Sequence, residues 1–135
     1  MKIDLEYLKN LLEAFESAET PVTDINELKE KGFLENEDVF LFHLQIMEDE
    51  GLVQGKPDGG LGYTRSISGG VYWSDVPLRL TSQGHQFLDS LRNKEVWNAI
   101  KTGFKEHSIG TLLTISKDLL NGFLKKKVSA LIDED

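Results

Sequence analysis

The spacing of hydrophobic residues changes at Gly51, and this change constrains the fold more than any other feature of the chain. Before Gly51, apolar residues recur every three or four positions, as they do along amphipathic helices. After it come Leu52, Val53 and the glycine-dense stretch "GKPDGGLGYTRSISGGVYW". Glycine at this density indicates turns, and the β-branched and aromatic residues between the glycines indicate short strands. We therefore expect an α+β chain, mostly helical, with a β-ribbon near its middle.

Two helices are expected in the first third of the chain. The first covers residues 4–19, and Asp4 can accept backbone hydrogen bonds as its N-cap. The second covers "DINELKEK", with Thr23 as the expected N-cap and Gly32 at its end. Both have the apolar spacing of helices that pack on a core.

A third helix is expected from Asn36, as N-cap, to about Glu50, with Gly51 in the usual position after a helix. One broad apolar face is predicted for it. That face consists of Val39, Phe40, Phe42, His43, Ile46 and Met47.

The ribbon is expected to hold two or three short antiparallel strands, because Val76, Leu78 and Leu80 alternate with Pro77 and Arg79. Three helices should follow. Their expected N-caps are Thr81 or Ser82 for "SQGHQFLDSLR", Asn93 for "KEVWNAIKTGFKEH" and Ser108 for the last helix.

This order of elements is that of a winged helix-turn-helix with a Gly-rich β-wing and additional C-terminal helices. The expected division is a winged-helix domain over residues 1–92. A helical extension over residues 93–135 would pack on it or form a dimer.

Three segments, "HLQIMEDEGL", "LTSQGHQFLDSLR" and "VW", resemble a family of small uncharacterised bacterial proteins that is common in prophages and mobile elements. The family is described as a domain of unknown function. The first segment departs from the family pattern at Met47, where Leu is frequent, and lacks an Ala between Glu50 and Gly51. The resemblance implies a winged-helix-like fold and brings no known activity.

The distribution of charge weighs against DNA as the target. Residues 1–64 hold five Lys/Arg and fifteen Asp/Glu, a net charge of −10, whereas residues 65–135 hold ten and eight, a net charge of +2. Duplex binding depends on cations that neutralise phosphates. The third helix has no Lys or Arg, and Gln45 is its one good base-reading side chain.

No enzyme, cofactor or metal site is expected. The chain has no cysteine, and its histidines, His43, His85 and His107, lack the spacing of a helical metal motif. We expect structural roles for them, with Asp89 pairing His85. Thr81 and Ser82 lie near His85, but an N-cap accounts for both.

The ribbon carries the most interesting surface, because cations and aromatic residues alternate there among glycines. Such a mixture suits a nucleic acid and a protein hot spot equally, and a purely structural role is the alternative. One of Tyr72 and Trp73 should pack inward, since neighbouring strand residues point to opposite faces. The candidate contact residues are Gln45, Lys56, Tyr63, Arg65, Trp73 and Arg79.

The last helix has an apolar stripe, with Lys125, Lys126 and Lys127 near its end. We expect this helix to form a homodimer, ahead of packing within the chain and of membrane contact. The candidate dimer residues are Leu112, Leu119, Phe123 and Leu124.

The sequence thus favours a non-enzymatic winged-helix interaction module, regulatory and from a prophage or mobile element, that binds a protein partner. The alternative is a dimeric DNA-binding transcriptional regulator. No signal peptide or membrane-spanning segment is visible, so a cytoplasmic protein without a membrane partner is expected.

Overall fold

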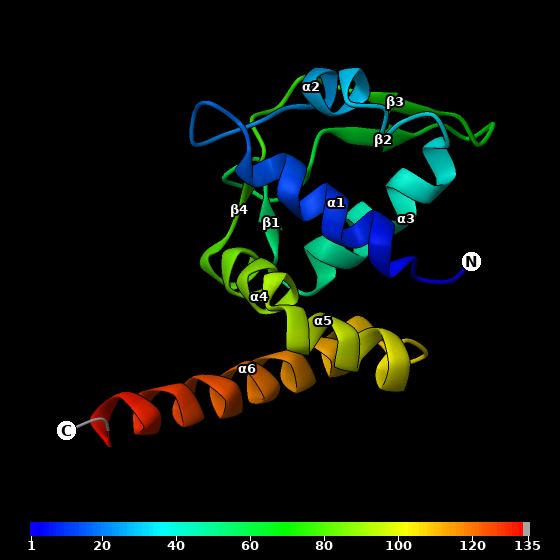
Figure 1. Cartoon of the computed structure of the whole chain (residues 1–135). Helices are drawn as coiled ribbons and strands as arrows, with labels where there is room; N and C mark the ends of the chain where they lie inside the picture. The colour runs from blue at the N-terminus through cyan, green and yellow to red at the C-terminus, as the bar shows by residue number, and fades with distance from the viewer. Residues whose placement is uncertain (134–135) are drawn as a thin grey trace. The chain divides into compact units, whose positions relative to one another are not determined.

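The computed structural model describes residues 1–133 and has an α+β fold that is mostly helical, as predicted. Two small antiparallel sheets accompany the helices (Figure 1). The elements are α1 (Leu5–Glu16), α2 (Ile25–Glu30), α3 (Glu37–Asp49), β1 (Val53–Gln54), β2 (Tyr63–Arg65), β3 (Val71–Trp73), β4 (Arg79–Leu80), α4 (Ser82–Arg92), α5 (Lys94–Ala99), the π-helical turn η1 (Ile100–Phe104) and α6 (Ile109–Ile132).

The chain forms two compact units, Met1–His85 and a second that begins at Gln86, so the boundary falls inside α4. Residues 134 and 135, which belong to the expected C-terminal extension, lie outside the described residues.

The helix N-termini follow local hydrogen bonding. Asp4, Asn36, Asn93 and Ser108 each accept a bond from the backbone N–H three residues later, which confirms four predicted caps. The prediction for α2 was wrong, because its N-cap is Asp24.

Thr23 is only 3% exposed and belongs instead to an extended segment before α2. Its backbone N–H and C=O both bond to Leu78, which forms an isolated antiparallel bridge. Its hydroxyl donates to Glu27 Oε2 at 2.7 Å. This long-range pairing holds Thr23 one residue short of the helix and leaves the cap to Asp24.

Four strands form two separate ribbons, where two or three strands were expected. In the first, β1 pairs with β4 through Val53 and Leu80. In the second, β2 pairs with β3, and Tyr63 lies opposite Trp73. Residues 74–78 connect the two ribbons. Val76 and Leu78 of this segment and Leu80 of β4 are buried in the predicted alternation.

The core of the first unit lies between its helices and the β1–β4 ribbon. The predicted face of α3 needs correction, because Leu41 and Leu44 are buried, whereas Val39, Phe42 and Ile46 are only half-buried. The fully buried large side chains of this unit are Leu8, Leu11, Leu12, Leu28, Phe40, Leu44, Met47, Leu52 and Leu78.

The start of α4 is fixed to the segment that follows α3. Thr81 is the cap of α4, since its hydroxyl oxygen accepts from the Gly84 N–H at 3.1 Å, and that hydroxyl donates to the Gly51 carbonyl. A Cβ at Gly84 would lie 2.2 Å from the Leu52 carbonyl oxygen. The backbones therefore meet at a distance that only glycine allows.

In the second unit, one helix was expected over residues 94–107, but α5 is short and continues as the π-helical turn η1. Helix α6 contacts both α5 and η1 and buries Ile109, Leu112 and Ser116. Among residues 1–133, no helix has the length and apolar character needed to cross a membrane.

Candidate interaction surface of α3 and the β2–β3 hairpin

The β2–β3 hairpin lies against α3 through aromatic and amide contacts (Figure 1). The ring of Trp73 is 5.4 Å from that of Phe40 and 5.6 Å from that of Tyr63. Gln45 Nε2 donates to the Tyr63 hydroxyl at 3.2 Å, and Trp73 Nε1 donates to Glu37 Oε1 at 3.4 Å. The structure thus brings together three of the six candidate residues, Gln45, Tyr63 and Trp73.

The two neighbouring aromatic residues of β3 point to opposite faces, as predicted for a strand. Trp73 is half-buried against α3, whereas Tyr72 is 65% exposed. Ile67, at the tip of the hairpin, is also fully exposed. The role of Trp73 is therefore largely to hold the hairpin on α3.

A groove of about 240 Å³ lies beside these contacts. Its surface is mostly apolar, and Arg65 is among the residues that line it. Neither Arg65 nor Asp38 has an ion pair or side-chain hydrogen bond among residues 1–133, so both charges are available to a ligand. The lining residues are Met1, Asp38, Leu41, Phe42, Gln45 and Arg65.

We call Asp38, Phe42, Gln45 and Asp49 the outward face of α3, because their spacing of four, three and four residues places them along one side of the helix. Asp38 and Asp49 are exposed, and the two residues between them are half-buried. A carboxylate therefore stands at each end of this face, with an aromatic ring and an amide in the middle. Sequence reasoning missed Asp38 and Phe42, although their helical spacing from Gln45 would have indicated both.

Two candidate residues lie outside this surface. Arg79 belongs to the β1–β4 ribbon and donates to Gln54 Oε1 at 2.6 Å. Lys56 is exposed in a turn closed by hydrogen bonds between its own backbone and that of Gly59 and Gly60. Neither lines the groove.

His43 has a structural role that accounts for both of its ring nitrogens. The backbone N–H of Asp4 donates to Nε2 at 2.9 Å, so that nitrogen carries no proton. Nδ1 therefore carries the proton and donates it to the Val39 carbonyl at 2.8 Å. Burial lowers the pKa of His43, against smaller raising effects of the Val39 bond and the Asp4 charge. The neutral ring thus fastens the start of α1 to α3, beside Tyr7, whose pKa burial raises.

The other two histidines lie at the surface. His85 Nδ1 is 3.9 Å from Glu16 Oε2, so its acidic neighbour is Glu16, and the predicted pairing with Asp89 was wrong. The His107 ring contacts that of Phe104 at 5.7 Å. Within residues 1–133, no three His, Asp or Glu side chains are arranged to hold a metal ion.

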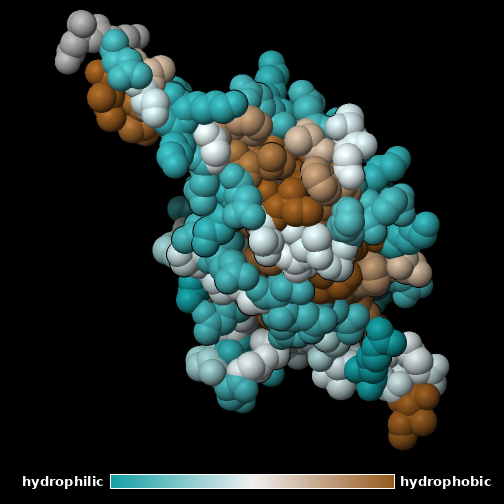
Figure 2. Space-filling model, turned by 90° about the horizontal axis from the view of Figure 1, so that it is seen from below, coloured by the Kyte–Doolittle hydropathy of each residue, from teal (hydrophilic) through white to brown (hydrophobic). Residues whose placement is uncertain are grey.

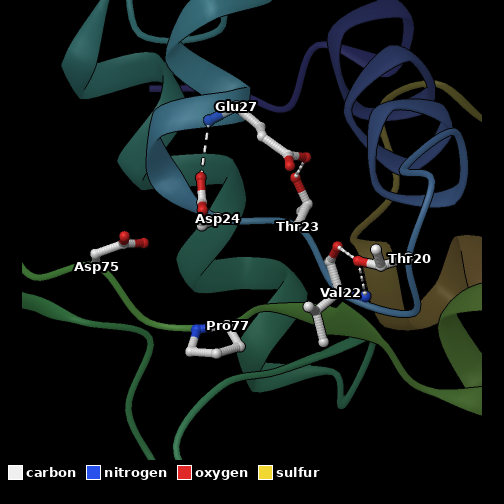
Figure 3. A pocket seen from close by; sticks show the side chains of 7 residues that line it. All are labelled: Thr20, Val22, Thr23, Asp24, Glu27, Asp75 and Pro77. Carbon is white, nitrogen blue, oxygen red and sulfur yellow. Dashed lines mark hydrogen bonds between the residues drawn. The ribbon is translucent and has the colours of Figure 1, made fainter.

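A second hollow, of about 340 Å³, lies between the start of α2 and the segment before β4 (Figure 3). Its acidic groups are largely engaged by the fold, because Asp24 caps α2 and Glu27 accepts from Thr23. Asp75 adds a third carboxylate at its edge. The hollow is thus a product of how α2 begins.

The family model described as "Hypothetical protein (DUF2513)" matches residues 2–110. The chain belongs to this family. A protein of Haemophilus influenzae (strain ATCC 51907 / DSM 11121 / KW20 / Rd), described as "Uncharacterized protein", is 25% identical over 88 residues, which are 65% of this chain and 67% of the relative. No solved structure matches the chain.

The DUF2513 match includes the surface of α3 and the hairpin but ends at the first turn of α6. Beyond Phe123, every described residue of α6 is exposed. Figure 2 shows hydrophobic side chains, in brown, exposed at the surface. The large apolar residues exposed on α6 are Leu124, Val128, Leu131 and Ile132. Of the candidate dimer residues, Leu112 is fully buried, Leu119 and Phe123 are half-buried and Leu124 is exposed.

Proposed function

We propose that this DUF2513 protein is a non-enzymatic, regulatory interaction module of the cytoplasm, with a winged-helix arrangement, that binds a protein partner. In this proposal α3 takes the position of the recognition helix and the β2–β3 hairpin that of the wing. The outward face of α3 carries the proposal, because it has a carboxylate at each end and no cation. Such a face is suited to a protein and poorly suited to phosphates.

The charges around this face support the same conclusion. Glu37 and Asp38 occupy the first turn of α3, and Glu48 and Asp49 the last. In a DNA groove these four carboxylates would face phosphates, and Arg65 is the only Lys or Arg among the described residues that line the adjoining groove. Repulsion between like charges thus disfavours the use of α3 as a DNA reader.

Titration of the protein with labelled duplex DNA of mixed sequence tests this function. At low ionic strength, about 50 mM salt, electrostatic binding is strongest, and we expect no binding at micromolar protein. Salt-sensitive binding that is lost in Lys56→Ala plus Arg65→Ala would contradict the proposal.

A dimeric DNA-binding regulator is the second candidate function. The element order and the exposed Arg65 on the hairpin favour it, because a wing cation can contact the phosphate backbone. The same titration distinguishes the two functions, since this candidate requires binding whose affinity falls steeply with salt.

We further propose that α6 joins two copies of the chain into a homodimer. Its exposed apolar residues beyond Phe123, which include the candidate Leu124, support this, together with the half-buried Leu119 and Phe123. Leu112 is fully buried and is no longer a candidate. Light scattering should give the mass of a dimer for the natural chain and of a monomer for Leu124→Ser plus Leu131→Ser; a monomeric natural chain would refute the dimer.

A further inference from the structure

We infer that the partner segment bound by the outward face of α3 is basic, with one large apolar side chain between Lys or Arg residues. This inference rests on the proposed function and names the chemistry of its partner. The apolar side chain would occupy the α3–hairpin groove, and the cations would face Asp38 and Asp49.

The groove has the size and surface for an apolar side chain. Its volume is about 240 Å³, and its lining includes Leu41, which is 2% exposed. An apolar cavity of about 150 Å³ is enough to bind benzene. The half-exposed ring of Phe42 forms part of the lining, so a bound aliphatic or aromatic side chain would bury that ring as well.

The charges determine what surrounds that side chain. Asp38 and Asp49 are eleven residues apart, which is about 16 Å along a helix axis. The positively charged groups of the residues that line the groove are the Arg65 guanidinium and the amino terminus of Met1. The four carboxylates of Glu37, Asp38, Glu48 and Asp49 on α3 outnumber them. Complementary charge on the partner therefore means cations on both sides of the apolar residue.

A basic helix satisfies this geometry directly. Cations at positions i and i+11 of such a helix are separated by the same distance as Asp38 and Asp49, and apolar residues at i+4 and i+7 lie between them on the same side. Helix-in-groove binding of this kind uses apolar anchors for affinity and charge for orientation. A second copy of the same face is a poor occupant, because its carboxylates would repel those of the first.

Two labelled helical peptides with the same leucine positions test the inference, one with lysines at all flanking positions and one with glutamates. Fluorescence anisotropy should show binding of the lysine peptide to the full chain and roughly tenfold weaker or no binding of the glutamate peptide. Binding of the lysine peptide should weaken as salt is raised. Replacement of its central leucines by serine should weaken it further, because the groove would lose its apolar occupant.

Matched variants of the chain locate the binding site. Asp38→Lys plus Asp49→Lys should weaken the lysine peptide roughly tenfold, because two attractions become repulsions. The control, Glu19→Lys plus Asp58→Lys, changes the net charge equally at exposed positions away from the groove and should leave affinity nearly unchanged. Circular dichroism confirms that each variant is folded.

Three results would overturn the inference: no binding of the lysine peptide, equal binding of both peptides, or equal losses in the variant and its control. The duplex titration separates this failure from that of the proposed function. Salt-sensitive DNA binding refutes the protein-binding module itself, whereas absence of both DNA and peptide binding refutes only the basic partner.

Discussion

The helices α3 and α6 are both rich in apolar residues, but they use them differently. Helix α3 buries Phe40, Leu41, His43, Leu44 and Met47, so one side of its whole length is part of the core. Helix α6 is longer, yet its buried residues lie in its first eight positions, and each of its described residues beyond Phe123 is exposed.

This difference separates side chains that are buried and stabilise the fold from exposed side chains that can contact another molecule. On α3 the division runs along the helix, because the buried side faces the core and the outward face carries Asp38, Phe42, Gln45 and Asp49. On α6 the division runs across the helix, between its buried start and its exposed end. Substitutions at matched positions on the two helices test whether these divisions hold.

The largest effect is expected for Phe40→Ala on the buried side of α3. Phe40 is fully buried and supports Trp73 of the hairpin. Removal of such a ring leaves a cavity and should lower the free energy of unfolding by about 3–5 kcal/mol. Denaturant unfolding followed by tryptophan fluorescence measures this loss, and Phe42→Ala on the outward face is the control that should lose less. Equal losses at the two positions would remove the distinction between the two faces.

The next effect concerns the contact between α4 and the segment after α3. In Gly84→Ala, the new methyl group would lie 2.2 Å from the Leu52 carbonyl oxygen, so the backbone must move. We expect a loss of about 1–3 kcal/mol in the free energy of unfolding, as for other overpacked sites. A neutral or stabilising Gly84→Ala would show that α4 can shift away from Leu52 without cost.

The third prediction concerns pH. Because burial lowers the pKa of His43 in the folded chain, the unfolded chain binds more protons as the pH falls below the ordinary value of about 6.5. Stability is therefore full above that pH and is lost as the pH falls toward the lowered pKa. The slope contributed by one such group is at most about 1.4 kcal/mol per pH unit.

Unfolding measured between pH 7.5 and 5 on the natural chain and on His43→Gln should show this slope only in the natural chain. His107→Gln is the control, because His107 is exposed and should leave the slope in place. An identical slope in all three chains would assign the pH dependence to other groups.

A smaller effect, of opposite sign, is expected for Gly122→Ala on α6. No atom lies within 4 Å of the position of the added Cβ, and Gly122 is exposed. Alanine should stabilise the helix interior by about 0.5–1 kcal/mol. Thermal unfolding followed by helical circular dichroism measures the gain, and a loss would show that this side of α6 already contacts something.

The sequence predicted what depends on neighbouring residues. The caps Asp4, Asn36, Asn93 and Ser108 bond to N–H groups three residues away, so their residue types and positions were sufficient evidence. The change of period at Gly51 likewise placed the ribbon segment, and Gly51 has the positive φ of 68° that ends α3.

What the sequence could not predict depends on residues distant in the chain. Asp24 rather than Thr23 caps α2 because Thr23 pairs with Leu78. His85 lies near Glu16 instead of its helical neighbour Asp89 because α1 is close in space. The sequence indicated Gln45, Tyr63 and Trp73 as candidate contact residues. It could not predict that they contact one another beside a groove, because these contacts depend on the pairing of β2 with β3 and on the packing of that hairpin against α3.

The smallest effect on folding is expected at the exposed end of α6. Leu124 and Leu131 are 46% and 63% exposed, so Leu124→Ser plus Leu131→Ser removes little contact within the chain. At protein concentrations too low for association, the free energy of unfolding should change by less than about 0.5 kcal/mol per substitution. At high concentration the natural chain should gain stability from association, and the variant should not, because binding to the folded state alone stabilises it. A large loss at low concentration would mean that these leucines pack within one chain, and the end of α6 would then belong to the fold in the same way as the buried side of α3.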